Sequence, residues 1–314
     1  MGRGTALLLA LMTALPMPAF GSTTADALDA SWLDAAWDFD RPAESEARFR
    51  SGLATLPAGS AARLELLTQL DRAQGLLRQF DAAHATLDAV ERALPGSPER
   101  VAIRYLLERG RVFNSARQPE RAVPLFHDAL LRARAAGEDF LAIDAAHMLG
   151  IAAPTDDRLR WNLEAVAMTE KTGDPRARRW LASLYNNIGW TYHDRGDYAT
   201  ALAHFEKALS AWEARGDSHG VLIARWTVAR AYRSLGRYDE ALRIQRQLEV
   251  ECAAADAPDG YVYEELGELL LARGDIAAAR PNFARAFELL AHDADLQANE
   301  PDRLARLRRL GGVE

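Results

Sequence analysis

The sequence has few of the residue patterns that metal, nucleotide or hydrolase sites require. Its 314 residues include a single cysteine, Cys252, which excludes an internal disulfide and is expected to be a buried or partly buried spectator thiol. There is no His-Glu-x-x-His, no paired Cys-x-x-Cys, no glycine-rich phosphate loop and no Gly-x-Ser-x-Gly. We therefore expect no metal, no cofactor and no enzymatic activity.

Long apolar runs are also missing. The apolar run near the start, residues 6–15, has ten residues, about half of the roughly 20 that a membrane-spanning helix needs. A basic residue precedes it, and two prolines and a small-x-small sequence follow it, which is typical of a secretory signal peptide. We predict a signal peptide over residues 1–21 with cleavage after Gly21, or alternatively after Ala27. No cysteine follows the run for lipid attachment, so we expect a periplasmic or secreted protein with no stable membrane span.

Basic residues are outnumbered, and lysine is almost absent. The chain has 38 basic and 45 acidic residues, a net charge of −7, and its lysines are Lys171 and Lys207. Nucleic acid is therefore not an expected partner. Apolar residues make up 49% and charged residues 26%, as in ordinary globular proteins, and no Gly/Ser- or Pro-rich linker divides the chain. This favours one continuous solenoid over separate domains.

What the chain does contain is a repeat of about forty residues. In the clearest unit a small residue in Ile188-Gly189 is followed by Tyr192, a glycine turn at 195–198, and a second helix carrying Ala201, Phe205 and Ala208. Each unit reads as two amphipathic helices joined by a tight turn. The small position recurs at steps of 39, 40, 39, 40 and 38 residues, at positions 71, 110, 150, 189, 229 and 267.

This pattern resembles the tetratricopeptide repeat family. The resemblance covers residues 60–290 in six units, and it implies an all-α fold, a right-handed superhelical solenoid of stacked helix–turn–helix repeats. The commonest period of the family is 34 residues, so the helices or the turns here must be longer. Members of this architecture bind very different partners, and the resemblance does not name a ligand.

Both ends of the repeat region are expected to be capping structure, because a stack of helices would otherwise expose an apolar face. For residues 22–59 we predict an N-terminal helical cap with apolar positions at Trp32, Leu33, Ala36, Trp37, Phe49 and Leu53. For residues 291–314 we predict a C-terminal capping helix that starts near Pro301, buries Leu304, Leu307 and Leu310, and stops at Gly311-Gly312. Its basic residues are Arg303, Arg306, Arg308 and Arg309.

The third unit departs from the pattern. Leu149-Gly150 fits the small-residue column, but the residues after it do not. Pro154 lies four residues after Gly150, and proline both lacks an amide hydrogen and clashes with the preceding helical turn. We expect the first helix of this unit to end early or to kink, which leaves a possible break in the stack.

The inner face of the first helices is the surface that packing leaves available for binding. Positions three before, one after and four after the small residue share that face. In the fourth and fifth units these positions hold amide, indole and guanidinium groups, which suit a peptide segment with an acidic group. The predicted groove residues are Asn186, Trp190, His193, Trp226, Arg230 and Arg233, together with Arg111 and Asn114 of the second unit. Glu264 and Glu268 make the sixth unit acidic.

These residues lead to three hypotheses of different classes. The first is a non-enzymatic scaffold of the cell envelope that binds a protein or peptide in this groove. The second is a self-associating structural protein whose basic C-terminal helix docks on the acidic face of a neighbouring copy. The third is an enzyme, or a protein that binds an envelope polymer, with a site around His147 in the break after Gly150. The oligomeric state is left open by the sequence.

Overall fold

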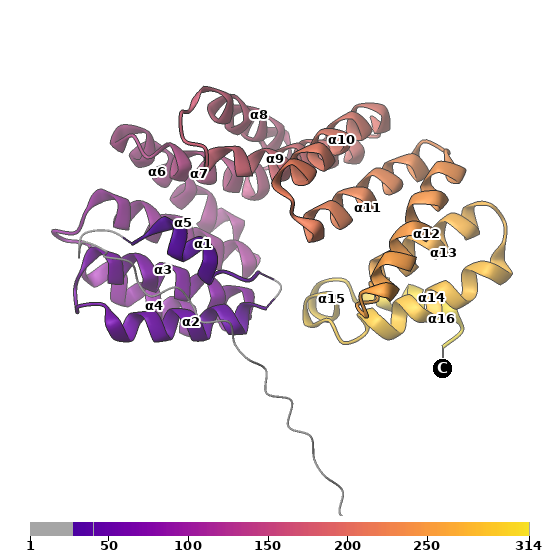
Figure 1. The fold of residues 1–314 in the computed structure, drawn as a ribbon, viewed down its shortest axis with the longest axis horizontal. Coiled ribbons are helices and arrows are strands. Elements are labelled where there is room, and N and C mark those ends of the chain that lie inside the picture. Colours follow the sequence, from indigo (N-terminus) through magenta and orange to yellow (C-terminus); the bar gives the residue numbers. More distant parts are fainter. Residues whose placement is uncertain (1–27, 40, 314) are drawn as a thin grey trace, which may run out of the picture. The chain divides into compact units, whose positions relative to one another are not determined.

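The computed structural model describes residues 28–39 and 41–313, so the predicted signal peptide lies outside the described residues. Every regular element in the described part of the chain is helical (Figure 1). The chain divides into two compact units, 1–141 and 142–314, with the boundary inside α7. The helices up to this boundary are α1 (Ala30–Ala36), α2 (Pro42–Thr55), α3 (Ala61–Leu76), α4 (Phe80–Arg92), α5 (Glu99–Ser115), α6 (Pro119–Ala136) and α7 (Asp139–Ala152).

The second unit continues with helices that follow one another in pairs. They are α8 (Thr155–Lys171), the 3₁₀ turn η1 (Ala177–Arg179), α9 (Trp180–Asp194), α10 (Tyr198–Arg215), α11 (Ser218–Ser234), α12 (Tyr238–Ala254), α13 (Gly260–Ala272), α14 (Ile276–Leu290), α15 (Ala294–Asn299) and α16 (Pro301–Gly311). Helix α9 packs on α10, α11 on α12 and α13 on α14. The protein is therefore built of stacked helical hairpins, as predicted. The domain boundaries given above stay predictions.

The turns inside the hairpins show why the helices stop and restart where they do. Gly196 and Gly274 have left-handed φ angles of 79° and 81°, which end α9 and α13 without steric strain. The next residues, Asp197 and Asp275, then cap the following helices, because their carboxylates accept hydrogen bonds from the backbone amides of residues 200 and 278 at 3.1 and 3.0 Å. Each Arg-Gly-Asp sequence at these turns is thus a helix stop followed by a helix start.

A glycine facing a phenylalanine joins the two helices of the best-formed hairpins. A Cβ atom added to Gly110 or Gly189 would come within 2.5 Å of the ring of Phe126 or Phe205, and one added to Gly267 within 2.8 Å of Phe283. These rings are fully buried or nearly so. The small-residue column is therefore needed for close helix approach, and the aromatic residue sixteen positions later fills the space beside it.

The third hairpin keeps this contact with different residues. Helix α7 ends at Ala152, before Pro154, which confirms the predicted early end. Asn162 lies against Gly150 in place of the aromatic ring, and its Nδ2 donates to the carbonyl of Gly150 at 3.1 Å. Asn162 follows Gly150 by 12 residues rather than 16, so about one helical turn is missing. The residues after Gly150 do not fit the repeat columns because this deletion shifts their register.

The first and fifth hairpins replace the glycine–phenylalanine pair by other residues. Asp71 occupies the small position of the first hairpin, and Gln245 occupies the aromatic position beside Ala229 in the fifth. Both side chains are completely buried. Among the described residues, neither the carboxylate oxygens of Asp71 nor the amide group of Gln245 has a hydrogen-bond partner. These two hairpins therefore hold polar groups without hydrogen-bond partners among the described residues, where the second, fourth and sixth hairpins hold a glycine and a phenylalanine.

The predicted caps pack as expected. In the N-terminal cap Trp32, Leu33, Phe49 and Leu53 are buried in one cluster with residues of α3, while Trp37 is partly buried at its edge. At the other end Leu304 and Leu307 of α16 are buried in the cluster that contains α13 and α14, and Leu310 is partly buried against it. Cys252 is buried. Over the described residues, no helix has both the length and the apolarity that crossing a lipid bilayer requires.

Candidate functional site

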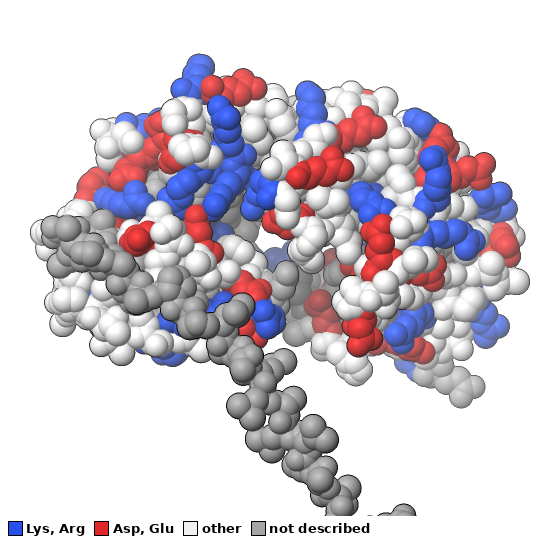
Figure 2. All heavy atoms as spheres, in the orientation of Figure 1, with Lys and Arg blue, Asp and Glu red and all other residues white. Residues whose placement is uncertain are grey.

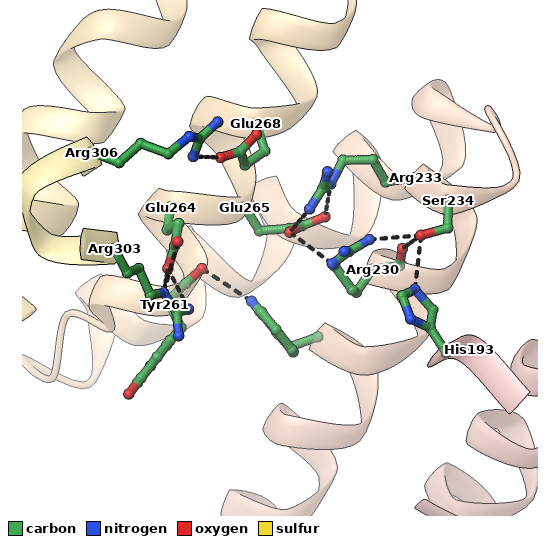
Figure 3. A network of polar contacts seen from close by, with 11 residues as sticks. His193, Arg230, Arg233, Ser234, Tyr261, Glu264, Glu265, Glu268, Arg303 and Arg306 are labelled. Atoms are coloured by element: carbon green, nitrogen blue, oxygen red, sulfur yellow. Dashed lines mark hydrogen bonds and ion pairs between the residues drawn. The ribbon is translucent and has the colours of Figure 1, made fainter. Parts of the chain in front are cut away.

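The predicted groove residues of the second unit lie on two neighbouring inner helices. Helix α9 carries Asn186, Trp190 and His193, and α11 carries Trp226, Arg230 and Arg233. All six are half-buried, so part of each side chain is open to solvent. Five of them contact residues of the neighbouring inner helices, as Figure 3 shows for the polar ones. The inner face thus packs against neighbouring repeats and also leaves a surface open to solvent.

The two tryptophans form an aromatic contact across the helices. The ring centroids of Trp190 and Trp226 lie 6.3 Å apart, and that of Tyr261 on α13 lies 6.5 Å from Trp226. The indole nitrogen of Trp226 donates to the backbone carbonyl of Tyr261 at 3.0 Å. The hydrogen-bond donor of Trp226 is therefore used within the protein, and its ring remains as an apolar contact surface.

A buried carboxylate organises the two arginines of α11. Glu265 of α13, only 2% exposed, accepts hydrogen bonds from Nε and Nη2 of Arg233 at 2.5 and 2.9 Å. Burial opposes the charge of Arg233, but the bidentate bond to Glu265 raises the pKa of its guanidinium. Arg230 interacts more weakly with Glu265, since its Nε is 3.9 Å from that carboxylate. Its Nη1 donates to Ser234 Oγ at 2.6 Å.

His193 also belongs to this group of polar side chains. Its Nε2 lies 2.9 Å from Ser234 Oγ, the same hydroxyl that accepts from Arg230 (Figure 3). Burial, and then the nearby charge of Arg230, lower the pKa of His193. The imidazole is therefore neutral at pH 7 and adds no charge.

The charges in this cluster do not cancel. Two guanidinium groups, Arg230 and Arg233, share the single carboxylate of Glu265. Burial, and then the neighbouring Arg233, lower the pKa of Arg230, whereas Glu265 and Glu268 raise it. An arginine nevertheless remains protonated at neutral pH. The inner face of α11 therefore holds one surplus positive charge.

The acidic residues of α13 are neutralised from within the chain, contrary to expectation. Arg303 of α16 binds Glu264, and Arg306 of α16 pairs with Glu268 (Figure 3). Burial opposes the charge of Arg303, but its hydrogen bonds with Glu264 raise its pKa. The sixth unit is thus not an exposed acidic surface, and these two arginines of the C-terminal helix are not free for an acidic neighbour. Interhelical pairs 38 and 39 residues apart carry no local sequence signal.

The two remaining predicted residues belong to the first unit and are described there by themselves. Arg111 and Asn114 lie on α5 and are half-buried. Nη1 of Arg111 donates to the buried carboxylate of Glu108 at 2.7 Å, and Arg72 of α3 approaches the same carboxylate at 3.9 Å. Arg111 is therefore part of an internal ion-pair cluster of the first unit.

Residues outside the predicted set complete the site. Ser234, Tyr261 and Glu265 hold Arg230, Trp226 and Arg233 in place, but they lie at positions that do not belong to the chosen inner-face columns. A signal for Glu265 exists, since it lies two residues before Gly267, as Glu108 lies two before Gly110. Over the described residues, no group of three or more histidine, cysteine or carboxylate side chains is placed to hold a metal ion.

The third hypothesis places a site around His147. His147 of α7 is half-buried, and its ring lies 4.9 Å from that of Trp180 at the start of α9. This is an aromatic packing contact inside the second unit. On the face drawn in Figure 2, basic side chains gather near α7 to α9, and acidic and basic side chains are interspersed elsewhere on that face.

Comparisons with known proteins agree with this architecture. Residues 180–248 and 261–281 match tetratricopeptide repeat profiles. No curated protein matches the chain. A tetratricopeptide repeat protein from Parabacteroides merdae is 17% identical, with a TM-score of 0.52, and the match covers 89% of this chain and 97% of that one.

Two further solved structures share the fold. The complex of NprR with its cognate peptide NprX has 15% identity and a TM-score of 0.58, over 89% of this chain and 81% of that one. A signal-transduction ATPase with a tetratricopeptide repeat sensor from Pyrococcus horikoshii has 13% identity and a TM-score of 0.60, over 85% of this chain. The chain spans only 42% of the length of that ATPase. The chain therefore contains tetratricopeptide repeats within residues 180–281, and it shares the fold of these solved structures.

Proposed function

We propose that the protein is a non-enzymatic scaffold of the cell envelope that binds a protein or peptide segment on the inner face of α9 and α11. The bound segment presents an acidic group to Arg230 and apolar side chains to Trp190 and Trp226. This surface combines a cation, two rigid aromatic rings and the amide of Asn186, which are the groups that fix a peptide by charge, contact area and backbone hydrogen bonds.

The observation that carries the proposal is the incomplete pairing of Arg230. Its guanidinium is half-buried, lies beside a second guanidinium, and is 3.9 Å from the carboxylate of Glu265, which already binds Arg233. A carboxylate supplied by a partner would form the short, charge-assisted hydrogen bonds that no carboxylate of the described residues forms with Arg230. The surplus charge at this place therefore favours an acidic ligand over a basic one.

The envelope location and the peptide ligand have separate support. The location rests on the N-terminal sequence, whose basic residue, short apolar run and small-x-small ending have the order found in secretory signal peptides. The class of ligand is supported by the NprR structure, in which a protein of similar fold is seen with its cognate peptide.

The test compares three versions of the chain without residues 1–21 in affinity capture from envelope extract. These are the unchanged chain, Arg230→Ala, and the control Arg243→Ala, which removes an exposed arginine from α12 of the same unit. The captured species is then reduced to its shortest binding segment, and its affinity is measured by titration calorimetry. Loss of a charge-assisted hydrogen bond of about 1.5–3 kcal/mol predicts a Kd at least about tenfold weaker for Arg230→Ala.

The expected result is a species that the unchanged chain and Arg243→Ala retain and that Arg230→Ala loses. The far-ultraviolet circular dichroism of all three should be the same, since neither change touches the hairpin cores. A species retained equally by all three versions would show that the binding surface lies elsewhere. A captured segment without acidic residues would disprove the proposed role of Arg230.

A further inference from the structure

Helix α16 has the sequence register of an inner helix of a repeat. Leu266 and Gly267 of α13 recur 38 residues later as Leu304 and Ala305, and Leu269 recurs as Leu307. The left-handed glycine after α13, Gly274, recurs at the same spacing as Gly312, with φ angles of 81° and 64°. The leucines of this set are buried in both helices. Helix α16 is thus a seventh inner helix and more than a plain cap.

The packing of α16 agrees with this register. It packs on α14 as α11 packs on α10 and α13 on α12. Figure 1 shows α16 running beside α14. Arginines on its other side bind Glu264 and Glu268 of the preceding inner helix, α13. What differs is the second helix of the hairpin, since no helix follows α16 among the described residues.

The place of that second helix is an open apolar depression. It has a volume of about 600 Å³ and is lined by Phe287, Leu304, Ala305, Arg308, Arg309 and Val313. Ala305 stands at the small position, where Gly189 and Gly267 receive the rings of Phe205 and Phe283 in the earlier hairpins, but here it is exposed. The depression therefore has the position of a socket for an aromatic side chain on an antiparallel helix.

The charges at the rim point to an acidic occupant. Of the four arginines of α16, Arg303 and Arg306 pair with α13, whereas Arg308 and Arg309 are exposed and bind no carboxylate among the described residues. In α13 the corresponding residues are Leu270 and Leu271, which belong to or pack against the core. The socket thus has two cations where α13 has two leucines.

We propose that the face of α14 and α16 is a second docking surface, which binds an amphipathic acidic helix of a partner protein. The helix places an aromatic side chain over Ala305 and carboxylates against Arg308 and Arg309. It stacks as the second helix of the seventh hairpin. This surface is separate from the inner face of α9 and α11, and its occupant differs from the segment proposed there.

The probe for this surface is a fluorescent peptide with the sequence of α10, residues 198–215, in which Lys207→Glu makes it acidic. This helix already carries Phe205 in the register that fits a small position of the repeat. Binding to the full chain is measured by fluorescence anisotropy. We expect saturable binding that weakens at least about tenfold when the peptide carries Phe205→Ala, since one buried aromatic ring contributes several kcal/mol.

Two protein variants locate the binding. The double change Arg308→Glu, Arg309→Glu should weaken the Kd at least about tenfold, whereas Arg243→Glu, Arg246→Glu on exposed positions of α12 should leave it unchanged. Ala305→Trp should fill the socket and block binding without disturbing the fold, because residue 305 is exposed. A charge-reversed peptide with lysines should regain affinity for the first double variant.

Several results would overturn the proposal. It fails if the peptide does not bind, if the change of Phe205 in the peptide has no effect, or if Arg308→Glu, Arg309→Glu and Ala305→Trp bind as well as the unchanged chain. It also fails in its choice of partner if the chain self-associates in light scattering and Ala305→Trp abolishes that association, because the occupant is then a second copy. None of these results depends on the outcome of the Arg230→Ala experiment.

Discussion

Two buried carboxylates, Glu265 in the second unit and Asp71 in the first, have opposite surroundings. Glu265 accepts two hydrogen bonds from Arg233, whereas neither oxygen of Asp71 has a hydrogen-bond partner among the described residues. Burial raises the pKa of both, opposed at Glu265 by Arg233 and reinforced at Asp71 by Glu108. An equal degree of burial therefore accompanies an ion pair in one unit and, in the other, an acid without a hydrogen-bond partner among the described residues.

The difference comes from the position of each residue in its repeat. Glu265 lies two residues before the small position and faces the preceding inner helix, where Arg230 and Arg233 reach it. Asp71 occupies the small position itself, which in other hairpins faces the second helix of the hairpin. A shift of two residues, about half a turn of the helix, and not the residue type decides whether a carboxylate meets a cation or a core.

The same column repeats its role in the first unit. Glu108 also lies two residues before a small position, and Arg72 approaches it at 3.9 Å, as Arg230 approaches Glu265 at 3.9 Å. In both units an arginine one residue after a small position reaches the acid of the next inner helix. These pairs join neighbouring repeats, so the groove arginines stabilise the stack as well as carrying charge.

Removing the paired carboxylate should have the largest effect. Glu265→Leu leaves Arg230 and Arg233 half-buried beside each other without a counter-charge. We expect a loss of about 3–5 kcal/mol in the free energy of unfolding, the usual effect of breaking a buried ion pair from one side. Urea unfolding of the full chain, followed by circular dichroism, measures this loss.

A matched control separates burial from charge. Glu251→Leu breaks the ion pair with Arg225, which lies on exposed or half-exposed positions of the same unit. Its expected loss is about 1 kcal/mol or less, because solvent screens such pairs. Equal losses for Glu251→Leu and Glu265→Leu would contradict the view that Glu265 is anchored by a buried pair.

Removing the carboxylate of Asp71 should stabilise the protein, and the size of this gain in the free energy of unfolding should depend on pH. The raised pKa of Asp71 means that the folded state holds its proton more tightly than the unfolded state. Stability is then lost as pH rises from the unfolded pKa of about 3.9 towards the folded one. We expect Asp71→Ala to stabilise the protein by about 1–3 kcal/mol at pH 8 and by less at pH 4.

The groups that face Asp71 allow a control for this prediction. They are Glu108, Arg109, Arg111 and Arg72, and the acid among them raises the pKa while the three cations lower it. Asp71→Asn removes the charge but keeps a polar group. It should therefore make stability less dependent on pH, as Asp71→Ala does, but with a smaller gain in stability. Identical dependence on pH between 4 and 8 in the unchanged chain and both variants would rule out a titrating Asp71.

The fold was predictable because its signals are local and periodic. Gly189, Tyr192 and Phe205 recur at fixed spacings, and these spacings determine which faces of two sequential helices meet. The missing turn between Gly150 and Asn162 hid the second half of the third unit, since alignment by a constant spacing fails across a deletion. Helix α16 was interpreted only as a cap, although Leu304 and Leu307 repeat Leu266 and Leu269 of α13.

The site was predictable only in outline. The inner-face columns placed Trp226, Arg230 and Arg233 on one surface, because helical geometry alone determines that. Their partners were missed, since Glu265 lies 32 residues from Arg233 and outside the three inner-face positions. Contacts between repeats depend on how closely the helices approach and on side-chain rotamers, which no single repeat encodes.

The smallest expected effect concerns a neutral counterpart of Asp71. Gln245 is completely buried beside Ala229, and its amide nitrogen and oxygen have no hydrogen-bond partner among the described residues. Gln245→Leu removes this unsatisfied group at similar size, and we expect a gain of about 1 kcal/mol that is the same at pH 4 and pH 8. If that gain changed with pH, titration of Asp71 could not be the cause of the pH dependence seen there. A gain in stability that is constant for Gln245→Leu and depends on pH for Asp71→Ala would show that the two buried side chains differ in charge and not only in polarity.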